Sequence, residues 1–321
     1  MVASAVTIRA VTAPSDLPSL VDPSRRSLGP DLIVGPLAFG CWRFVGTDVA
    51  KGQALVETAL DLGMDLVDTA DIYGRGWGGG GFGESEELLG AVLAAAPSLR
   101  DRMVLATKGG ISAGVPYDSS ARYLEAACDA SLRRLGVDVI DLYQVHRPDL
   151  LAHPSEVAGV LDSLVDAGKV RAVGVSNHTP AQTEALLAHL RAPLAATQPE
   201  LSALELTPLR DGTGDLAMGR SLAVLAWSPL AGGRLAGSGP STDASISPEL
   251  VATLDGLAVR ERVDRAAVAL AFVLSLPFRP VPILGTQSVE RLRSSVAALS
   301  VHLDRADCYR IIEASEGVPL P

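Results

Sequence analysis

The sequence predicts a single-domain α/β protein built as a (β/α)8 TIM barrel, and three observations support this prediction. Eight short apolar runs alternate with helical patterns along the 321 residues. The runs are apolar and rich in β-formers without strict alternation, as expected of parallel strands buried on both faces. A doubly wound sheet is the competing fold, and it would favour a composition shift or a linker between two halves, which the chain lacks.

The predicted elements follow one another in a regular order. Residues 1–24 are rich in Ala, Ser, Pro and Thr without a lasting period, which predicts a flexible or peripherally packed extension ahead of one domain over 25–321. The strands are expected at 36–40, 64–68, 103–107, 139–145, 170–175, 194–197, 222–226 and 281–284. Helices are expected between them, for example at 50–62, 84–95, 119–135, 155–167 and 180–190. Two long segments, 204–221 and 228–246, are predicted to be loops around the seventh strand.

Composition limits the classes of function. Hydrophobic residues make up 48% of the chain, enough for a large core, whereas aromatic residues are only 4%. The formal net charge of −10 argues against binding to nucleic acid or to an anionic membrane surface. No apolar run approaches the roughly 18 residues of a membrane span. The first residues lack the charged and apolar regions of a signal peptide, so a cytoplasmic protein is expected.

Neither a metal site nor a disulfide framework is expected. Cys41, Cys128 and Cys308 are widely spaced and odd in number, which does not suit paired disulfides or a thiolate zinc site. The 5 histidines show no paired spacing on a helix. Any chemistry must therefore come from other side chains.

Those side chains follow the predicted strands. The second strand ends on Asp68, with Tyr73 in the next loop, while Lys108 follows the third strand and His146 the fourth. Because the carboxyl ends of barrel strands form one rim, and barrel active sites lie there, these four side chains are expected to meet.

The set is suited to proton transfer onto a carbonyl oxygen. A phenol has a pKa of about 10 and is a weak acid, and a neighbouring ammonium such as that of Lys108 is expected to lower it. Asp68 would keep Lys108 charged, and a neutral His146 would orient the carbonyl. The hydride must then come from a cofactor. An alternative is a barrel enzyme that forms a Schiff base on Lys108.

Each residue also has an ordinary explanation by itself. A lysine after a strand is usually a solvated loop charge, a histidine at a strand end is usually structural, and Asp68 alone would suit a turn. Four such residues at three consecutive strand ends favour a catalytic set over coincidence.

Short motifs elsewhere occur in a fixed order around this set. They are Leu28-Gly29, Phe39-Gly40-Cys41-Trp42, Asp68-Thr69-Ala70-Asp71-Ile72-Tyr73-Gly74, Gly83-Glu84-Ser85-Glu86, Ala106-Thr107-Lys108, Leu142-Tyr143-Gln144-Val145-His146, Gly174-Val175-Ser176-Asn177, Gln198-Pro199-Glu200-Leu201-Ser202 and Trp227-Ser228-Pro229-Leu230. With them the chain resembles the aldo-keto reductase superfamily over about residues 25–315, and its bacterial oxidoreductases most. The resemblance implies an N-terminal hairpin ahead of the barrel.

The resemblance also implies an NADPH-dependent reductase, with NADH possible, that acts on a small carbonyl substrate. Tyr73 is then the general acid of a tetrad with Asp68, Lys108 and His146, and the nicotinamide lies against Trp227. The other residues implied to hold the cofactor are Gly40, Cys41, Trp42, Ser176, Asn177, Gln198, Ser228, Leu230, Gly285, Thr286, Gln287, Arg291 and Ser295. Among these, Ser176, Asn177 and Gln198 would hold the carboxamide.

The adenosine end is implied to lie at the last βα loop. Free N–H groups before a helix at Val289 suit a phosphate, and Arg291 matches the arginine that binds the 2′-phosphate in the superfamily. Gln287 stands where relatives commonly have Arg, and Ser295 where they have Asn. These departures concern the preference for NADPH. Because some members act mainly as partner subunits, a cofactor-binding sensor with little turnover stays open as an alternative, and so does the oligomeric state.

The substrate pocket is expected to include Trp42, Phe44 and Arg147, although Arg147 is equally suited to a salt bridge with Asp149. The glycine-rich stretch 74–83 also matches G-x-G-x-x-G, but its first glycine lies too far past the strand for a dinucleotide fingerprint. It is interpreted as a mobile insertion, either a surface loop or a flap that brings Trp77 and Phe82 over the substrate.

Overall fold

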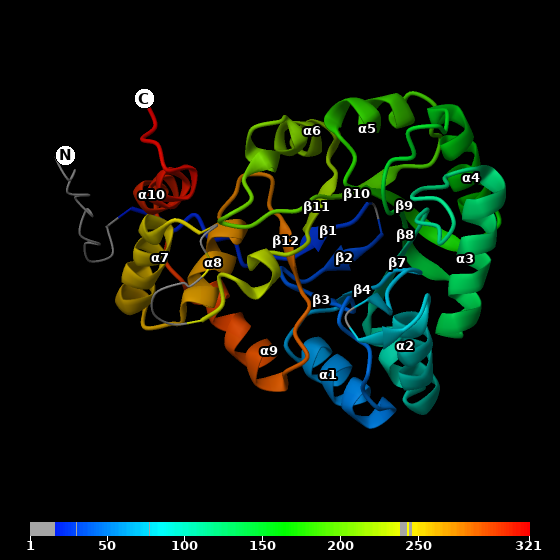
Figure 1. Cartoon of the computed structure of the whole chain (residues 1–321), viewed down its shortest axis with the longest axis horizontal. Coiled ribbons are helices and arrows are strands. Elements are labelled where there is room, and N and C mark those ends of the chain that lie inside the picture. The colour runs from blue at the N-terminus through cyan, green and yellow to red at the C-terminus, as the bar shows by residue number, and fades with distance from the viewer. Residues whose placement is uncertain (1–16, 30, 77, 238–242, 244–245) are drawn as a thin grey trace.

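Eight parallel strands close into a barrel at the centre of the molecule, which confirms the predicted fold (Figure 1). This computed structural model describes residues 17–29, 31–76, 78–237, 243 and 246–321. The strands neighbour one another in chain order, and the last pairs with the first. They are β3 (Ala38–Gly40), β4 (Leu66–Asp68), β7 (Val104–Gly109), β8 (Ile140–Val145), β9 (Val170–Ser176), β10 (Leu194–Gln198), β11 (Ala223–Ala226) and β12 (Val281–Leu284).

A short hairpin lies at the N-terminal ends of these strands. Strands β1 (Arg26–Ser27) and β2 (Ile33–Val34) pair antiparallel. Their connection carries Leu28 and Leu32, which are buried in one cluster with the inward-facing residues of the barrel. Gly35 N donates a hydrogen bond to Asp65, the residue just before β4. The hairpin therefore covers the end of the barrel where the strands begin and leaves the opposite end open for a site.

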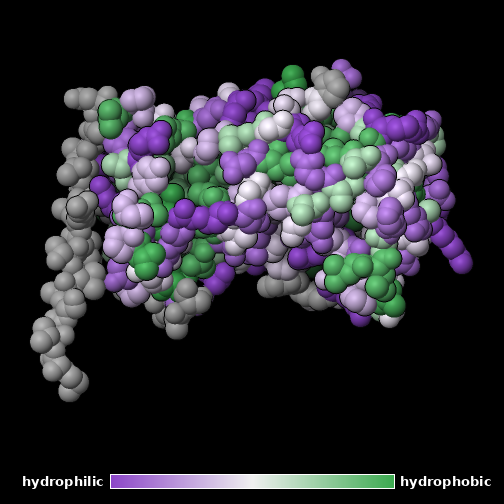
Figure 2. All heavy atoms as spheres, turned by 90° about the horizontal axis from the view of Figure 1, so that it is seen from above, coloured by the Kyte–Doolittle hydropathy of each residue, from purple (hydrophilic) through white to green (hydrophobic). Residues whose placement is uncertain are grey.

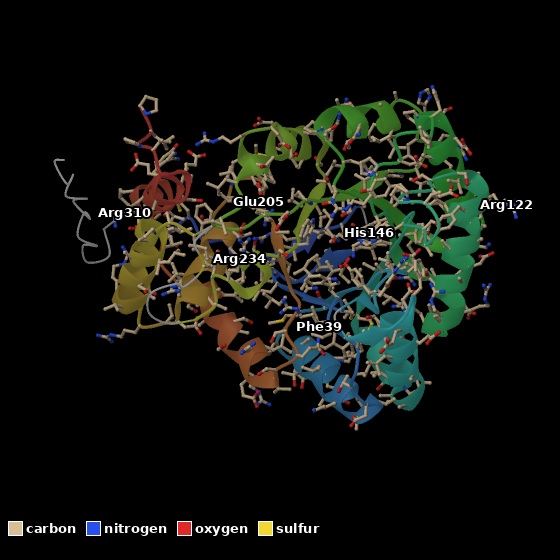
Figure 3. The ribbon with its side chains drawn as sticks, in the orientation of Figure 1. Phe39, Arg122, His146, Glu205, Arg234 and Arg310 are labelled. Carbon is tan, nitrogen blue, oxygen red and sulfur yellow. The ribbon has the colours of Figure 1, made fainter. Side chains whose placement is uncertain are left out.

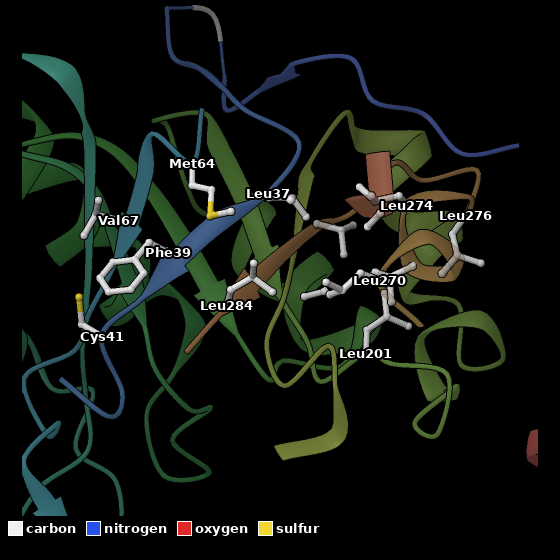
Figure 4. Close-up of a cluster of buried hydrophobic side chains, with 14 of the residues drawn as sticks. Leu37, Phe39, Cys41, Met64, Val67, Leu201, Leu270, Leu274, Leu276 and Leu284 are labelled. Atoms are coloured by element: carbon white, nitrogen blue, oxygen red, sulfur yellow. The ribbon is translucent and has the colours of Figure 1, made fainter. Parts of the chain in front are cut away.

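Helices surround the barrel (Figure 1). They are α1 (Val49–Asp61), α2 (Glu84–Ala95), α3 (Ala121–Leu135), α4 (Pro154–Asp166), α5 (Pro180–Leu187), α6 (Thr213–Arg220), α7 (Pro248–Glu261), α8 (Arg265–Leu274), α9 (Val289–Ser295) and α10 (Arg305–Glu316). Side-chain caps fix several of their starts, and α5 begins with a reciprocal capping box between Thr179 and Gln182. The buried faces of these helices meet the strands in a continuous apolar core, part of which Figure 4 shows around Phe39 and Leu270.

The two long segments near the seventh strand are not plain loops. Segment 204–221 contains a 3-10 turn, η2 (Thr207–Leu209), and the helix α6. The prediction missed α6 because it has only eight residues, starts at Gly212 without a side-chain cap and has little apolar periodicity. Segment 228–246 contains the 3-10 turn η3 (Ala231–Gly233), while residues 238–242 and 244–245 lie outside the described residues.

Residues 17–24 of the predicted extension lie against the barrel domain. Leu20 N donates to Leu303 O at 2.7 Å, and Asp22 N donates to Leu274 O at 3.3 Å. Asp22 also forms an ion pair with Arg279 at 2.7 Å. This segment therefore follows the peripherally packed alternative, and residues 1–16 lie outside the described residues.

The face seen in Figure 2 carries hydrophilic residues over much of its area, interrupted by smaller hydrophobic areas. Within the described ranges, no helix has the length and apolar character needed to cross a membrane.

Candidate active site

Strand register brings the predicted tetrad together at the open end of the barrel. Asp68, the last residue of β4, is paired with Ala106 of β7, and Lys108 of β7 is paired with Gln144 of β8. His146 follows β8 directly, and its N–H donates to Gly109 O at 2.8 Å. Each side chain thus takes its place from the position at which its strand ends.

Tyr73 reaches the same place through a loop that is tied to β7. Asp71 N donates to Lys108 O at 3.0 Å, and Tyr73 N donates to Ala70 O at 3.1 Å to close a tight turn. The first turn of α2 holds the loop from the other side, because Ser85 N donates to Tyr73 O at 3.2 Å. The phenol is therefore fixed by backbone hydrogen bonds on both sides.

Lys108 connects the acid and the phenol. Its side chain is only 1% exposed, and Nζ lies 2.6 Å from Asp68 Oδ2, 2.8 Å from Thr69 O and 3.3 Å from Tyr73 OH. Burial alone lowers the pKa of Lys108, but Asp68 and Tyr73 outweigh it and leave the pKa raised. Lys108 is therefore a charged ammonium, which is not a nucleophile, and this state disfavours the Schiff-base alternative.

Tyr73 stays protonated in the free protein, although the sequence predicted that Lys108 would lower its pKa. Burial raises the pKa of Tyr73, and the opposing effect of Lys108 does not cancel it. The phenol consequently holds the proton that a general acid must donate. An ammonium at this position would stabilise the phenolate if that proton were donated.

His146 faces Tyr73 across the site. The two rings lie edge to face, with centroids 5.8 Å apart and an interplanar angle of 78°. Burial lowers the pKa of His146 well below its ordinary value, and the cations Lys108 and Arg147 lower it further. The imidazole is neutral at neutral pH, so it can donate one hydrogen bond to a carbonyl oxygen without competing as a proton source.

A cavity of ≈ 720 Å³ opens from the tetrad toward α9. Figure 3 shows His146 near the middle of the ring of strands, whereas Arg122 and Arg310 lie at the periphery. The cavity is lined by these predicted residues: Gly40, Trp42, Asp68, Tyr73, His146, Arg147, Ser176, Asn177, Gln198, Trp227, Ser228, Leu230, Gly285, Thr286, Gln287, Arg291 and Ser295. The sequence thus located most of one continuous site from residues more than 200 positions apart.

Besides the buried Lys108, three predicted residues within the described ranges do not line the cavity. Phe44 is completely buried and packs edge to face on Phe39 in the core, so the prediction that it contacts substrate is wrong. Cys41 is also completely buried, and burial raises the pKa of its thiol (Figure 4). Phe82 is 36% exposed but lies outside the lining. Trp77 lies outside the described residues.

The glycine-rich stretch forms a small hairpin. Strands β5 (Arg75–Gly76) and β6 (Gly79–Gly80) pair antiparallel, and the Glu84 carboxylate accepts hydrogen bonds from the N–H groups of Gly80 and, at 3.4 Å, Gly46. Gly74 has φ +115, and a Cβ there would lie 2.2 Å from Gly81 O, so only glycine suits this position. The described residues of the stretch therefore form a hairpin beside Tyr73, and the mobility expected of the insertion stays a prediction.

A second set of polar groups fixes Trp227. Asn177 has φ 58, and its Nδ2 donates to His146 O at 3.1 Å and to Ser176 Oγ at 2.8 Å. Its Oδ1 accepts from Trp227 Nε1 at 2.9 Å. The guanidinium of Arg147 lies over the Trp227 ring, 5.8 Å from its centroid, and makes no ion pair with Asp149 or with any other described carboxylate. The indole is thus held in one orientation against the cavity.

At the far end of the cavity, the N-terminus of α9 offers fewer free N–H groups than the sequence analysis expected. Ser288 caps α9, since its Oγ accepts from Arg291 N at 3.2 Å and donates to Glu290 at 2.7 Å. Ser288 N also donates to Thr286 Oγ1 at 3.3 Å, so two N–H groups that were expected to be free are occupied, and the Glu290 carboxylate lies beside this helix start. The exposed guanidinium of Arg291 lines this end of the cavity and is suited to an anion.

Comparison with known proteins identifies the family. The model of the "Aldo/keto reductase family" matches residues 36–316. The chain belongs to the aldo/keto reductase family. It is an oxidoreductase of this family, as the sequence predicted.

Two bacterial relatives and one solved structure illustrate the likeness. A protein named 6-dehydroglucose reductase from Novosphingobium aromaticivorans is 48% identical over 310 residues, which cover 96% of this chain and 100% of the relative. A 6-dehydroglucose reductase from Agrobacterium fabrum is 36% identical, with coverage of 91% and 98%. The structure of the glycerol dehydrogenase AKR11B4 from Gluconobacter oxydans has a TM-score of 0.78 at 28% identity and covers 93% of this chain and 97% of its own.

Several residues of this aldo/keto reductase site were missed by sequence reasoning. Arg43, Gly232, Asp264, Leu270 and Ser294 line the cavity. Arg43 and Gly232 also join the loops after β3 and β11, because Arg43 Nη2 donates to Gly232 O at 3.0 Å. These residues lie on loops or helices, where no strand periodicity predicts which way a side chain points.

A buried carboxyl group beneath the Tyr73 loop predicts how the stability of this aldo/keto reductase depends on pH. Both carboxyl oxygens of Asp71 are buried without a hydrogen-bond partner in the described part of the chain. Burial raises the pKa of Asp71 well above 3.8, the buried anion Glu86 raises it further, and Arg134 opposes them. Above the unfolded pKa the native state therefore binds one proton more than the unfolded state, so the free energy of unfolding falls as pH rises toward the folded pKa.

Asp71→Asn removes this dependence while keeping the shape of the side chain. The stability of Asp71→Asn relative to the unaltered protein should therefore increase as the pH rises from about 4, the ordinary pKa of an aspartate, toward neutral pH. Urea unfolding of both proteins across this range measures the difference. A difference that stays constant with pH would show that Asp71 is ionised in the native state.

Proposed function

We propose that this protein reduces an aldehyde or ketone to an alcohol with NADPH, and that Tyr73 is the general acid. The observation that carries the proposal is the position of Lys108 Nζ, which contacts Asp68 at 2.6 Å and Tyr73 OH at 3.3 Å at the head of the cavity. An ammonium paired with a carboxylate beneath a protonated phenol is an arrangement for donating a proton and stabilising the resulting anion.

The side chains of the tetrad divide the proton transfer between them. A bound reduced nicotinamide would supply the hydride. The Tyr73 hydroxyl gives its proton to the carbonyl oxygen as negative charge develops there, and Lys108 stabilises the phenolate. Asp68 keeps Lys108 charged and in place. Neutral His146 orients the carbonyl by a hydrogen bond, which leaves Tyr73 as the proton donor.

The lining of the cavity suits a nicotinamide cofactor. Ser176, Asn177 and Gln198 lie together and present polar atoms that match a carboxamide, and the Trp227 ring beside them offers an aromatic face. We assign the remaining length of the cavity to the pyrophosphate and the adenosine. The residues proposed there are Gly40, Trp42, Ser228, Leu230, Gly285, Thr286, Gln287, Arg291 and Ser295.

Arg291 should decide between NADPH and NADH. Its guanidinium lines the far end of the cavity and forms no ion pair within the described ranges, so it is available for a 2′-phosphate. Arg291→Ala should raise the KM for NADPH by about tenfold to a hundredfold, the value of a charge-assisted contact, and leave the KM for NADH nearly unchanged. Steady-state kinetics with both cofactors measure this. Equal effects on the two would remove the assignment, and Arg293→Ala on the same helix serves as the matched control.

For the substrate we propose an aldehyde at C6 of glucose or a closely related sugar. The support is the name shared by the two relatives together with the coverage of nearly the whole of each chain. The mouth of the cavity adds to this support, because Trp42 offers an apolar face and Arg147 offers guanidinium donors with no carboxylate partner among the described residues. Sugar rings present both apolar faces and hydroxyl acceptors, so they complement such a surface.

The experiment compares NADPH oxidation with 6-dehydroglucose and with an unbranched alkyl aldehyde of the same chain length. The sugar aldehyde should have the higher kcat/KM, and Arg147→Met should reduce this advantage while leaving turnover of the alkyl aldehyde nearly unchanged. If the alkyl aldehyde were the better substrate, the sugar assignment would be wrong and carbonyl reduction would remain.

A further inference from the structure

Two buried amide side chains lie beneath the tetrad. Gln144 is the second-to-last residue of β8 and is completely buried. Its Nε2 donates to Asp68 Oδ1 at 3.3 Å. Gln198, the last residue of β10, donates from Nε2 to the same oxygen at 3.0 Å and to Gln144 Oε1 at 3.2 Å. Lys108 occupies the other oxygen of Asp68. The carboxylate is thus held by groups from three other strands.

The chemistry of Asp68 determines the orientation of both amides. An amide offers an oxygen or a nitrogen with little difference in shape, so its orientation is set by its partners. Asp68 is paired with an ammonium and can only accept hydrogen bonds, so Gln144 and Gln198 must both turn their NH2 groups toward it. Gln144 Oε1 is then left to accept the second N–H of Gln198.

This arrangement leaves Oε1 of Gln198 as an acceptor that faces neither Asp68 nor Gln144. Both hydrogens on Gln198 Nε2 are used, whereas no described residue donates a hydrogen bond to its Oε1. Gln198 also lines the cavity. The free oxygen is therefore available to a hydrogen-bond donor in the cavity, and the NH2 group of a carboxamide has the complementary character.

We propose that Gln144 is a positioning residue that acts in two directions. Through Gln198 it fixes the acceptor that receives the cofactor carboxamide, and through Asp68 it fixes the carboxylate that holds Lys108 beside Tyr73. Gln144 does not line the cavity, so it contacts neither cofactor nor substrate. The first of these two effects rests on the proposed function, whereas the second concerns the free protein.

A double-mutant cycle tests the link between the two amides. Gln144→Met keeps the shape of the side chain and removes both hydrogen bonds, and it should raise the Kd for NADPH about threefold to tenfold, the size of one or two neutral hydrogen bonds. In a Gln198→Met background the same substitution should change that Kd by less than about twofold, because interacting sites are not additive. Quenching of tryptophan fluorescence reports the Kd without turnover. Effects that simply add would overturn the proposal.

The thermal midpoint of the cofactor-free protein supplies a readout that is independent of the proposed function. The effects of the two substitutions on the thermal midpoint should also be non-additive, since either one already removes the hydrogen bond between the two amides. If the unaltered protein failed to bind NADPH, the proposed function would fail, while this cycle would still decide on the amide pair. Additive changes in the thermal midpoint would contradict the hydrogen bond between Gln144 and Gln198.

Gln144→Glu separates the two directions. The introduced carboxyl group retains an acceptor for Gln198, so the Kd for NADPH should stay near that of the unaltered protein. Its ionised form repels Asp68, so kcat should be low at neutral pH. Proximity to Asp68 raises the pKa of the introduced group, and its protonated form restores the donor to Asp68. The kcat of this variant should therefore recover as the pH is lowered, relative to the unaltered protein. A low kcat at every pH would contradict the positioning of Asp68 by this hydrogen bond.

Discussion

Tyr73→Phe should lower kcat by about a hundredfold to ten-thousandfold, the usual contribution of a positioned general acid. The ring and its contact with His146 remain, and only the hydroxyl that Lys108 contacts at 3.3 Å is removed. The affinity for NADPH should be largely retained, because the proposed role of the phenol is to donate a proton and not to build the cofactor part of the cavity.

Steady-state kinetics and cofactor titration of this variant are the measurements. Tyr309→Phe, on the exposed side of α10, is the matched control and should behave as the unaltered protein. Near-normal reduction by Tyr73→Phe would refute the assignment of the acid. A parallel loss of NADPH affinity would indicate damage to the site.

Lys108→Met should affect both turnover and stability. The ammonium that stabilises the Tyr73 phenolate is lost, so kcat should fall by at least about a hundredfold. Asp68, of which 3% of the side chain is exposed, is then buried without its cation. Removing one partner of a buried ion pair typically lowers the free energy of unfolding by about 3–5 kcal/mol.

The double variant Asp68→Asn with Lys108→Met distinguishes the two effects. Removing the unpaired carboxylate should restore much of the stability in urea unfolding, whereas kcat should stay low because the ammonium is still absent. Recovery of kcat together with stability would show that Lys108 has only a structural role.

The tetrad could be predicted because strand ends are a property of the sequence pattern. Asp68, Lys108 and His146 each stand at the end of an apolar run, and the closed barrel brings these ends to one rim. Gln198 and Trp227, which the resemblance implied, lie at the ends of later strands. The residues implied for the cofactor came from the family resemblance, and the cavity contains nearly all of them.

The failures share a physical cause. Phe44 stands in a loop, and the chain alone does not show that its ring turns inward onto Phe39. The expected lowering of the Tyr73 pKa treated charge without burial, and burial is the larger effect. The role of Gln144 depends on which amide atoms meet across three strands, and spacing along the chain does not specify this.

The most direct test of hydride transfer onto a substrate carbonyl uses NADPH deuterated at C4 of the nicotinamide, on the face that is transferred, in a single turnover with 6-dehydroglucose. The account predicts that deuterium appears at C6 of the glucose formed, and that Tyr73→Phe slows its appearance without changing the position of the label. Tight binding of NADPH with no transfer of deuterium to any carbonyl would contradict the account and favour a cofactor-binding sensor.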